Sequence, residues 1–264
     1  MPYIFNHACF SIRLLGRSIN CSIPDDMFIR DVFAMEPPSD SPDATLTVEP
    51  SEERFRIEVA WAGGIRAIRL AGEDACNMNI FRSCVGFLAH CLTPALFVHG
   101  CGLYSILKKK GVLILGAQGS GKTTIAGALP MTNIIDDDQV LVHGRELVGI
   151  GRRAAHTVRR KIGQTVLYEK TERRRARLGL VLLLAREREG GWIERFPIGD
   201  LLDDPGILWH HNLDAMEMPG HYCEGKKFPP VPAYRVGTSG GKRETIDEVR
   251  RLIDAMPTPP GLRS

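Results

Sequence analysis

The segment Gly116–Thr123, with the sequence GAQGSGKT, constrains this chain more than any other. It matches the phosphate-binding pattern G-x-x-x-x-G-K-S/T at every fixed position. An apolar run at 111–115 precedes it, and residues of helical composition follow at 124–129. This order predicts a buried strand, a glycine-rich turn and a helix, in which backbone N–H groups surround phosphate oxygens. The sequence therefore predicts an α/β unit that binds a nucleotide.

Two side chains of the turn have expected roles. Lys122 is expected to reach the β- and γ-phosphates, and the Thr123 hydroxyl is expected to hold Mg²⁺. The backbone of the turn supplies the remaining phosphate contacts. The predicted nucleotide-binding residues are therefore Gly116, Ala117, Gln118, Gly119, Ser120, Gly121, Lys122, Thr123 and Thr124.

Three aspartates follow the turn after a short path. The run 133–142 resembles an apolar strand that is interrupted by Asp136, Asp137 and Asp138. A kinase needs one carboxylate for Mg²⁺ and another that orients or deprotonates the attacking hydroxyl. Neighbouring residues on a strand point to opposite faces, so two adjacent aspartates can divide these roles only where the chain bends. The residues alone leave that division open.

These motifs together resemble the catalytic domain of HPr kinase/phosphorylase and its HPr-kinase-like relatives. The resemblance consists of Phe97–Gly100, the turn, the pair Asp137 and Asp138, and Glu146–Gly151, in that order. The short path from the turn to the acidic strand is also typical of this family and of the phosphoenolpyruvate carboxykinases that it resembles. The resemblance is specific over roughly 97–151 and looser beyond. It implies a P-loop catalytic domain of the HPr kinase/carboxykinase type.

The resemblance also implies roles for individual residues. ATP would be held by Lys122 and the amides of the turn, and Mg²⁺ by Thr123, Asp138 and Glu146. Asp137 would act as the base toward the acceptor hydroxyl. The implied catalytic residues are therefore Asp137, His99 and Lys122.

His99 has two interpretations. The resemblance places its imidazole beside Asp137, where it would help to set the protonation of that carboxylate. From the residues alone, an isolated histidine on a strand is usually a structural residue, so both interpretations stay open.

One part of the chain departs from the family pattern. Bifunctional members typically carry arginine where this chain has Val148, and an apolar run where it has Arg152 and Arg153. This departure argues against reverse phosphorylase activity and against HPr as the substrate. The two arginines are candidate substrate contacts, because a guanidinium group binds phosphate or carboxylate well.

The remaining sequence predicts a second unit. Short alternating runs between residue 10 and residue 70 predict antiparallel strands with one buried face, and apolar spacing predicts a helix over 77–92. We therefore expect a β-rich accessory domain over 1–92 and a P-loop kinase domain over 93–264, an α/β fold with α+β character. The stretch 201–230 is expected to be a long irregular excursion, which is typical of a lid, a binding loop or a plain insertion.

Composition limits the setting of the protein. The net charge of +3 is too small to indicate nucleic acid or a membrane surface as a partner. No apolar stretch approaches the ~20 residues of a spanning helix, and the amino terminus lacks the features of a secretory signal. The seven irregularly spaced cysteines favour buried thiols in a reducing cytosol. We expect a cytoplasmic protein.

These features predict an ATP- and Mg²⁺-dependent kinase that transfers the γ-phosphoryl group to an alcohol. The favoured acceptor is a serine hydroxyl of a protein, a peptide precursor or a small molecule. A homo-oligomer is compatible with the resemblance, since hexamers occur in that family. Two alternatives stay open: a nucleotide-sensing ATPase without an acceptor, and an enzyme of the carboxykinase type.

Overall fold

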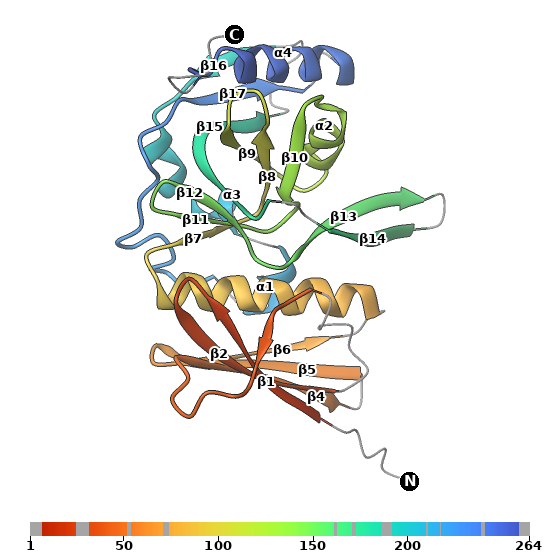
Figure 1. Ribbon diagram of the computed structural model, residues 1–264, viewed down its shortest axis with the longest axis vertical. Coiled ribbons are helices and arrows are strands. Elements are labelled where there is room, and N and C mark those ends of the chain that lie inside the picture. The colour runs from red at the N-terminus through yellow and green to blue at the C-terminus, as the bar shows by residue number, and fades with distance from the viewer. Residues whose placement is uncertain are drawn as a thin grey trace.

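The computed structural model of the chain describes residues 7–24, 32–51, 54–70, 74–160, 163–170, 173–185, 192–209, 211–216, 218–238 and 241–258. Figure 1 shows the amino-terminal sheet at one end, helix α1 (Asp74–Leu92) across the middle, and the carboxyl-terminal strands and helices at the other end. The candidate turn lies in the carboxyl-terminal part, between β9 (Lys110–Gly116) and α2 (Lys122–Ala128).

The amino-terminal part is a six-stranded sheet with the order β3-β1-β2-β4-β5-β6. Its strands alternate buried and exposed residues; on β2, for example, Ile19, Cys21 and Ile23 are buried. Neighbouring strands are antiparallel as the sequence predicts, except that β2 and β4 are parallel. The strands are β1 (His7–Leu14), β2 (Arg17–Pro24), β3 (Met35–Glu36), β4 (Ala44–Ser51), β5 (Arg54–Trp61) and β6 (Gly64–Leu70).

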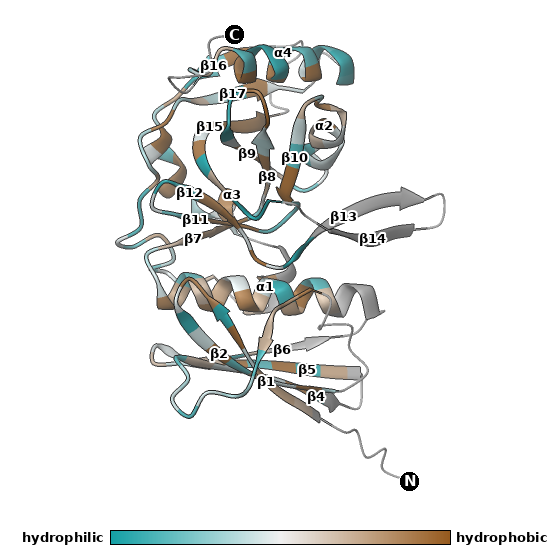
Figure 2. Ribbon diagram, viewed as in Figure 1, coloured by the Kyte–Doolittle hydropathy of each residue, from teal (hydrophilic) through white to brown (hydrophobic). Residues whose placement is uncertain are grey.

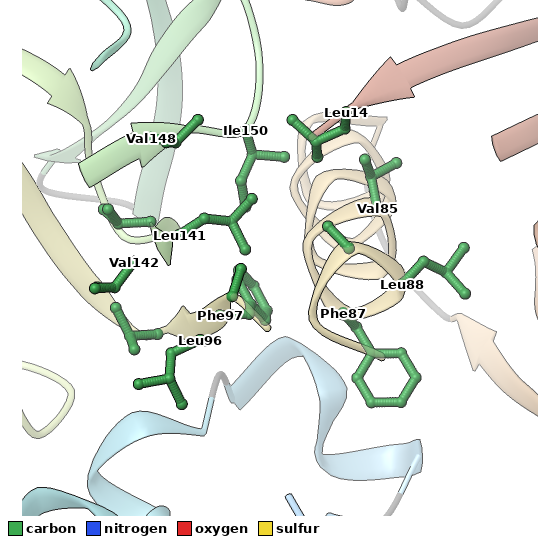
Figure 3. Packing of buried hydrophobic residues seen from close by; sticks show 14 of the residues in the cluster. Leu14, Val85, Phe87, Leu88, Leu96, Phe97, Leu141, Val142, Val148 and Ile150 are labelled. Carbon is green, nitrogen blue, oxygen red and sulfur yellow. The ribbon is translucent and has the colours of Figure 1, made fainter. Parts of the chain in front are cut away.

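Helix α1 is buried on several sides. It contacts β2, β4 and β5 of the amino-terminal sheet, and it contacts β7 (Leu96–Val98) and β11 (Val140–His143) of the second sheet. Figure 3 shows the side chains that meet along it, among them Leu14, Val85, Leu88, Phe97, Leu141 and Ile150. One hydrophobic cluster therefore runs from the amino-terminal sheet through α1 into the second sheet, and it passes through the domain boundary that the sequence predicts near residue 92.

The second sheet positions the turn. Among the described residues it has nine strands, in the order β10-β8-β9-β15-β12-β11-β7, with β17 beside β15 and β16 beside β17. β15 is parallel to both β9 and β17, whereas β8 and β9 form an antiparallel hairpin. The further strands are β8 (Gly100–Ser105), β10 (Thr132–Asp136), β12 (Glu146–Gly149), β15 (Arg175–Ala185), β16 (Ile193–Arg195) and β17 (Ala233–Gly237).

The remaining elements flank this sheet. Helices α2 and α4 (Lys242–Asp254) contact each other, and their apolar residues form a second cluster with β9, β15 and β17. Strands β13 (Arg153–Arg160) and β14 (Gly163–Lys170) pair only with each other among the described strands. Figure 2 shows hydrophobic residues concentrated on the central strands of the second sheet. In the part of the chain that the structure describes, none of the helices combines the length and the apolar character needed to cross a bilayer.

The stretch 201–230 is mostly irregular, as the sequence predicts, and contains short helical segments. They are η2 (Ile198–Leu202), α3 (Pro205–Leu208) and η3 (His211–Met216). Trp209, Leu213 and Tyr222 of this stretch are buried, and η3 contacts both α1 and β6. The apolar side chains hold the segment against the body of the protein.

A buried ion pair joins α1 to the acidic strand. Nη2 of Arg82 lies 2.5 Å from Oδ1 of Asp136, and neither side chain is exposed to solvent. Oδ2 of Asp136 accepts a hydrogen bond from the backbone N–H of Ile150 at 2.9 Å. A buried charge needs a partner because it has lost its hydration. The first aspartate of the triplet is thus a structural residue that ties the two parts of the chain together.

This ion pair generates a stability prediction. The substitution Arg82→Met leaves the Asp136 carboxylate buried without its cation, so we expect the free energy of unfolding to fall by about 3–5 kcal/mol. The double variant Arg82→Met with Asp136→Leu removes both charges and should recover more than half of that loss. Urea denaturation followed by circular dichroism measures both. A double variant less stable than Arg82→Met would contradict the assignment.

Candidate functional site

The turn after β9 has a conformation that requires glycine. Gly116, Gly119 and Gly121 have φ angles of +146°, +75° and +98°, which other residues rarely adopt. A Cβ atom on Gly116 would lie 2.7 Å from the Ser120 hydroxyl oxygen and 2.9 Å from the backbone oxygen of Leu184. The turn can therefore close tightly at the end of β9, and it delivers Lys122 and Thr123 to the start of α2.

Lys122 lies inside the turn. Its Nζ donates hydrogen bonds to the backbone oxygens of Gly116 at 2.8 Å and Ala117 at 3.2 Å, and the residue is only 5% exposed. Burial lowers the pKa of the Lys122 ammonium group, while the charges of Asp138 and Asp137 partly oppose that shift. The charged group is thus held by neutral carbonyl oxygens, next to the position where the motif places phosphates.

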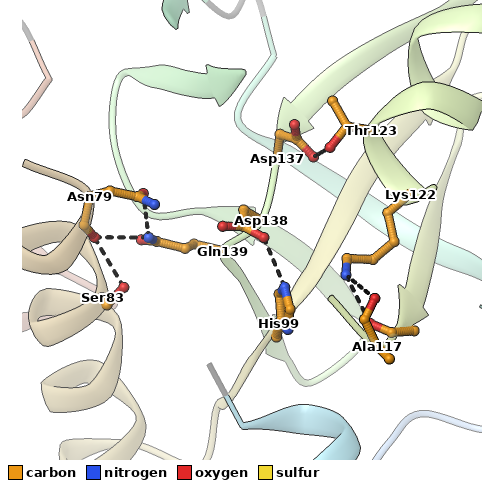
Figure 4. Close-up of polar contacts among 10 residues, drawn as sticks. Asn79, Ser83, His99, Ala117, Lys122, Thr123, Asp137, Asp138 and Gln139 are labelled. Carbon is orange, nitrogen blue, oxygen red and sulfur yellow. Dashed lines mark hydrogen bonds and ion pairs between the residues drawn. The ribbon is translucent and has the colours of Figure 1, made fainter. Parts of the chain in front are cut away.

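The aspartates that follow β10 point into different surroundings. Asp137 is 1% exposed, and its Oδ1 accepts a hydrogen bond from the Thr123 hydroxyl at 3.2 Å. Asp138 has a φ of +72°, so the chain bends there, and its side chain is 20% exposed. Figure 4 shows the two carboxylates directed to opposite sides of this bend. Two neighbouring aspartates on a strand can have separate roles only where the chain bends, and the chain does bend here.

His99 lies between β7 and β8 and faces Asp138. Its Nε2 is 2.9 Å from Oδ1 of Asp138, and the residue is 6% exposed (Figure 4). Its backbone N–H donates to the backbone oxygen of Leu208, which fixes the histidine from the other side. The resemblance predicts His99 beside Asp137, whereas the hydrogen bond of its imidazole is with Asp138. The structure therefore forms two pairs, Thr123 with Asp137 and His99 with Asp138.

A second contact holds the acidic bend to α1. The side-chain amide nitrogen of Gln139 donates to Oδ1 of Asn79 at 2.6 Å and to the backbone oxygen of Asn79 at 2.9 Å. Together with Arg82 and Asp136, this contact fixes the chain on both sides of the aspartate pair. This contact cannot be predicted from the sequence, because Asn79 and Gln139 are 60 residues apart.

Glu146 does not accompany the aspartates. It pairs with His143 at the tip of the β11–β12 hairpin, whereas Val140 and Gly149 pair at the end that lies near Asp138. Its Oε2 is 3.8 Å from Nη1 of Arg175, and its side chain is 47% exposed. β11 carries the chain away from the bend, and the tight turn at 144–145 returns it along β12. The structure thus separates Glu146 from the metal position that the resemblance implies for it.

The two candidate arginines follow β12. The backbone N–H of Arg152 donates to the backbone oxygen of Val32, and the Arg152 side chain is exposed, whereas Arg153 is partly buried. Burial lowers the pKa of the neighbouring Arg174 guanidinium group; the negative charge of Asp136 opposes this shift, and the charge of Arg152 adds to it. The Arg174 guanidinium group therefore lies close enough to the buried Asp136 to interact with it.

The candidate metal ligands are few. Among the described residues, no three histidine, cysteine, aspartate or glutamate side chains converge as a metal-binding group. Mg²⁺ commonly uses one or two protein oxygens and completes its shell with water and substrate phosphates. The hydroxyl of Thr123 and the carboxylate of Asp137, 3.2 Å apart at the start of α2, fit such a partial set.

A cavity of about 620 Å³ lies beside the turn. It is lined by His99, by turn residues between Gly116 and Ser120, and by the carboxyl end of β15. Further lining comes from the stretch 204–214, which includes Ile207, Trp209 and Asp214. The sequence suggested a binding loop in this region but could not show which residues face the turn.

Comparison with known proteins does not identify a family for this chain. No family model matches the chain, and no curated protein matches its sequence. Among solved structures it is similar to the Hpr(Ser) kinase/phosphatase from Coxiella burnetii, at 16% identity and a TM-score of 0.32. The match covers 60% of this chain and 88% of the other. A structural likeness of this size carries no conclusion about the reaction.

The burial of Lys122 generates a pH prediction. Its pKa is lowered below 10.5 in the folded protein, so the unfolded chain binds more protons as the pH approaches 10.5 from below. The free energy of unfolding of the wild type, minus that of Lys122→Met, should therefore rise with pH across this interval. Urea denaturation at a series of pH values measures this difference. The exposed Lys227, changed to Met, is the control, and a flat or falling difference for Lys122 would contradict the described environment.

Proposed function

We propose that this protein is an ATP- and Mg²⁺-dependent kinase that transfers the γ-phosphoryl group to an alcohol. The observation that carries the proposal is the arrangement of two pairs around the bend at Asp138. Thr123 with Asp137 lies on one side, and His99 with Asp138 lies on the other. A phosphoryl-transfer site needs both a metal position and a group that receives the acceptor's proton.

The turn supports the binding of the phosphates. Its glycines allow the backbone N–H groups to point inward, and Lys122 adds a cation within the same turn. In the structure, the Lys122 ammonium group donates to two neutral backbone oxygens. A charged phosphate oxygen is a stronger acceptor than a neutral carbonyl, so Lys122 would exchange these contacts for the β- and γ-phosphates.

The pair Thr123 and Asp137 fits the metal. Both offer oxygen atoms, and the Asp137 carboxylate is almost fully buried at the start of α2. The Thr123 hydroxyl and the Asp137 carboxylate would hold Mg²⁺, whose positive charge would help to neutralise the charge that develops during transfer. This assignment exchanges the roles that the resemblance implies for Asp137 and Asp138. It leaves Glu146 without a role in metal binding.

The pair His99 and Asp138 suits the base. A base has to reach the acceptor, and Asp138 is the more exposed of the two carboxylates. The acceptor oxygen would form a bond to the γ-phosphorus while the bond to the bridging oxygen of ADP breaks. The hydroxyl proton passes to Asp138, whose position is fixed by the hydrogen bond to Nε2 of His99. A nucleotide sensor without an acceptor would have no need for this second pair.

The division of roles predicts that substitutions of the two aspartates impair the reaction in different ways. Asp138→Asn keeps the shape but cannot take a proton, so kcat should fall by roughly 10²–10⁴ while MgATP still binds. Asp137→Asn should instead weaken Mg²⁺ binding and raise the Mg²⁺ concentration needed for half-maximal turnover. Calorimetric titration with a non-hydrolysable ATP analogue, beside turnover assays at varied Mg²⁺, separates the two effects. The opposite pattern would restore the roles that the resemblance implies.

Lys122 provides a test of the phosphate site itself. Lys122→Ala removes the cation from the turn and should abolish transfer, whereas circular dichroism should show the wild-type fold. Lys122→Arg is the matched variant, since it keeps the charge but not the fit inside the turn, and it should also be severely impaired. Normal turnover in Lys122→Ala would remove the turn from the proposed site.

A further inference from the structure

The cavity beside the turn has a chemical character that bears on the acceptor. We propose that it binds the acceptor as a small alcohol with an ammonium group, an amino alcohol. This inference rests on the proposed kinase function and specifies the substrate class of the same site. It comes from the position, the charge and the rigidity of the cavity walls.

The position of the cavity fits an acceptor. Its lining includes His99, whose imidazole is bonded to the proposed base Asp138, together with Gly116, Ala117, Gln118 and Ser120 of the turn. Among the described residues, neither Thr123 nor Asp137 lines it. An occupant would therefore lie beside the turn and beside the imidazole that holds the proposed base, so an acceptor hydroxyl could approach Asp138 from the cavity.

The charge of the lining favours a cation. Asp204 and Asp214 contribute exposed carboxylates to the wall, and the lining residues that the structure describes include no lysine or arginine. A phosphorylated or carboxylated acceptor would meet like charges here, whereas an ammonium group would be attracted. Arg174 instead interacts with the buried Asp136, and the Lys122 ammonium group is held by the backbone oxygens of Gly116 and Ala117.

The apolar part of the lining suits the alkyl groups around an ammonium nitrogen. Leu183, Ile207 and Trp209 contribute to it. The indole nitrogen of Trp209 donates a hydrogen bond to Oδ1 of Asp214 at 3.0 Å, so an aromatic ring and a carboxylate stand side by side in the wall. This combination of aromatic ring and carboxylate is well suited to alkylammonium ions, which are attracted both to ring faces and to negative charge.

The wall is fixed to the body of the protein. The Tyr222 hydroxyl donates to the backbone oxygen of Phe97 at 2.6 Å, and the Trp209 ring meets the rings of Phe87 and Tyr222 edge to face. Nζ of Lys226 donates to the backbone oxygens of His90 and Thr93. The cavity is therefore formed before an acceptor arrives, which reduces the entropy cost of binding. Its volume of about 620 Å³ lies within the range of small-molecule sites.

Choline and its uncharged carbon isostere, 3,3-dimethylbutan-1-ol (dimethylbutanol), provide the test. Both present one primary hydroxyl and nearly the same shape, so they differ in charge alone. With MgATP as donor, we expect kcat/KM for choline to exceed that for dimethylbutanol by tenfold or more. Glycerate, an anionic alcohol, should be the poorest acceptor. Transfer is measured by mass spectrometry of the phosphorylated product.

Two charge-removing variants connect the preference to the cavity. Asp214→Asn retains an oxygen that accepts from Trp209 but loses the charge, and Asp204→Asn loses the second charge. Each should raise KM for choline about tenfold without changing KM for ATP or for dimethylbutanol. Asp203→Asn is the matched control, since Asp203 is exposed and adjacent but does not line the cavity.

The outcomes separate this inference from the kinase proposal. Calorimetric titration of choline into the MgADP complex measures binding without turnover. If choline binds there, and Asp214→Asn weakens it, but no alcohol is phosphorylated, the cavity assignment stands and the kinase proposal fails. If alcohols are phosphorylated with no preference for choline, or a seryl peptide is strongly preferred, the kinase proposal stands and this inference fails. A raised KM for ATP in Asp214→Asn would assign the cavity to the nucleoside and would also overturn the amino-alcohol inference.

Discussion

The ion pair between Arg82 and Asp136 is the contact on which the site depends. It fixes the end of β10 to α1 inside the protein, where an unpaired charge would be costly. Gln139 and Asn79 make a second attachment three residues further along the chain. The short segment between these anchors has to bend, and Asp138 takes the positive φ that the bend requires. The direction of the two remaining carboxylates follows from that bend.

This arrangement gives the amino-terminal part of the protein a positioning role. Helix α1 packs its apolar residues into one continuous core with both sheets, and its polar residues hold the acidic bend. The stretch 201–230 is anchored on the same helix and on β7, and it supplies the outer wall of the cavity. Helix α1 therefore holds both the acidic bend and the stretch 201–230 in place. A change in the amino-terminal sheet would reach the site through this helix.

The sequence predicts the site best where the residues that form it lie close together along the chain. The strand, turn and helix around Lys122 follow from a motif whose glycines adopt the positive φ angles that other residues rarely take. It could not assign the aspartates, because their partners Thr123, His99 and Arg82 come from three distant segments. The place of Glu146 was hidden for the same reason, since only strand pairing reveals that it lies at the tip of the β11–β12 hairpin. The cavity wall was equally hidden, because burial of Trp209 depends on tertiary contacts with α1.

The most direct test is a crystal structure with Mn²⁺ and a non-hydrolysable ATP analogue. Anomalous scattering locates the metal, and electron density locates the terminal phosphate. The account predicts the metal beside the Thr123 hydroxyl and the Asp137 carboxylate, with Asp138 and His99 facing the terminal phosphate from the side of the cavity. A metal bound to Asp138, or a terminal phosphate remote from both pairs, would contradict it.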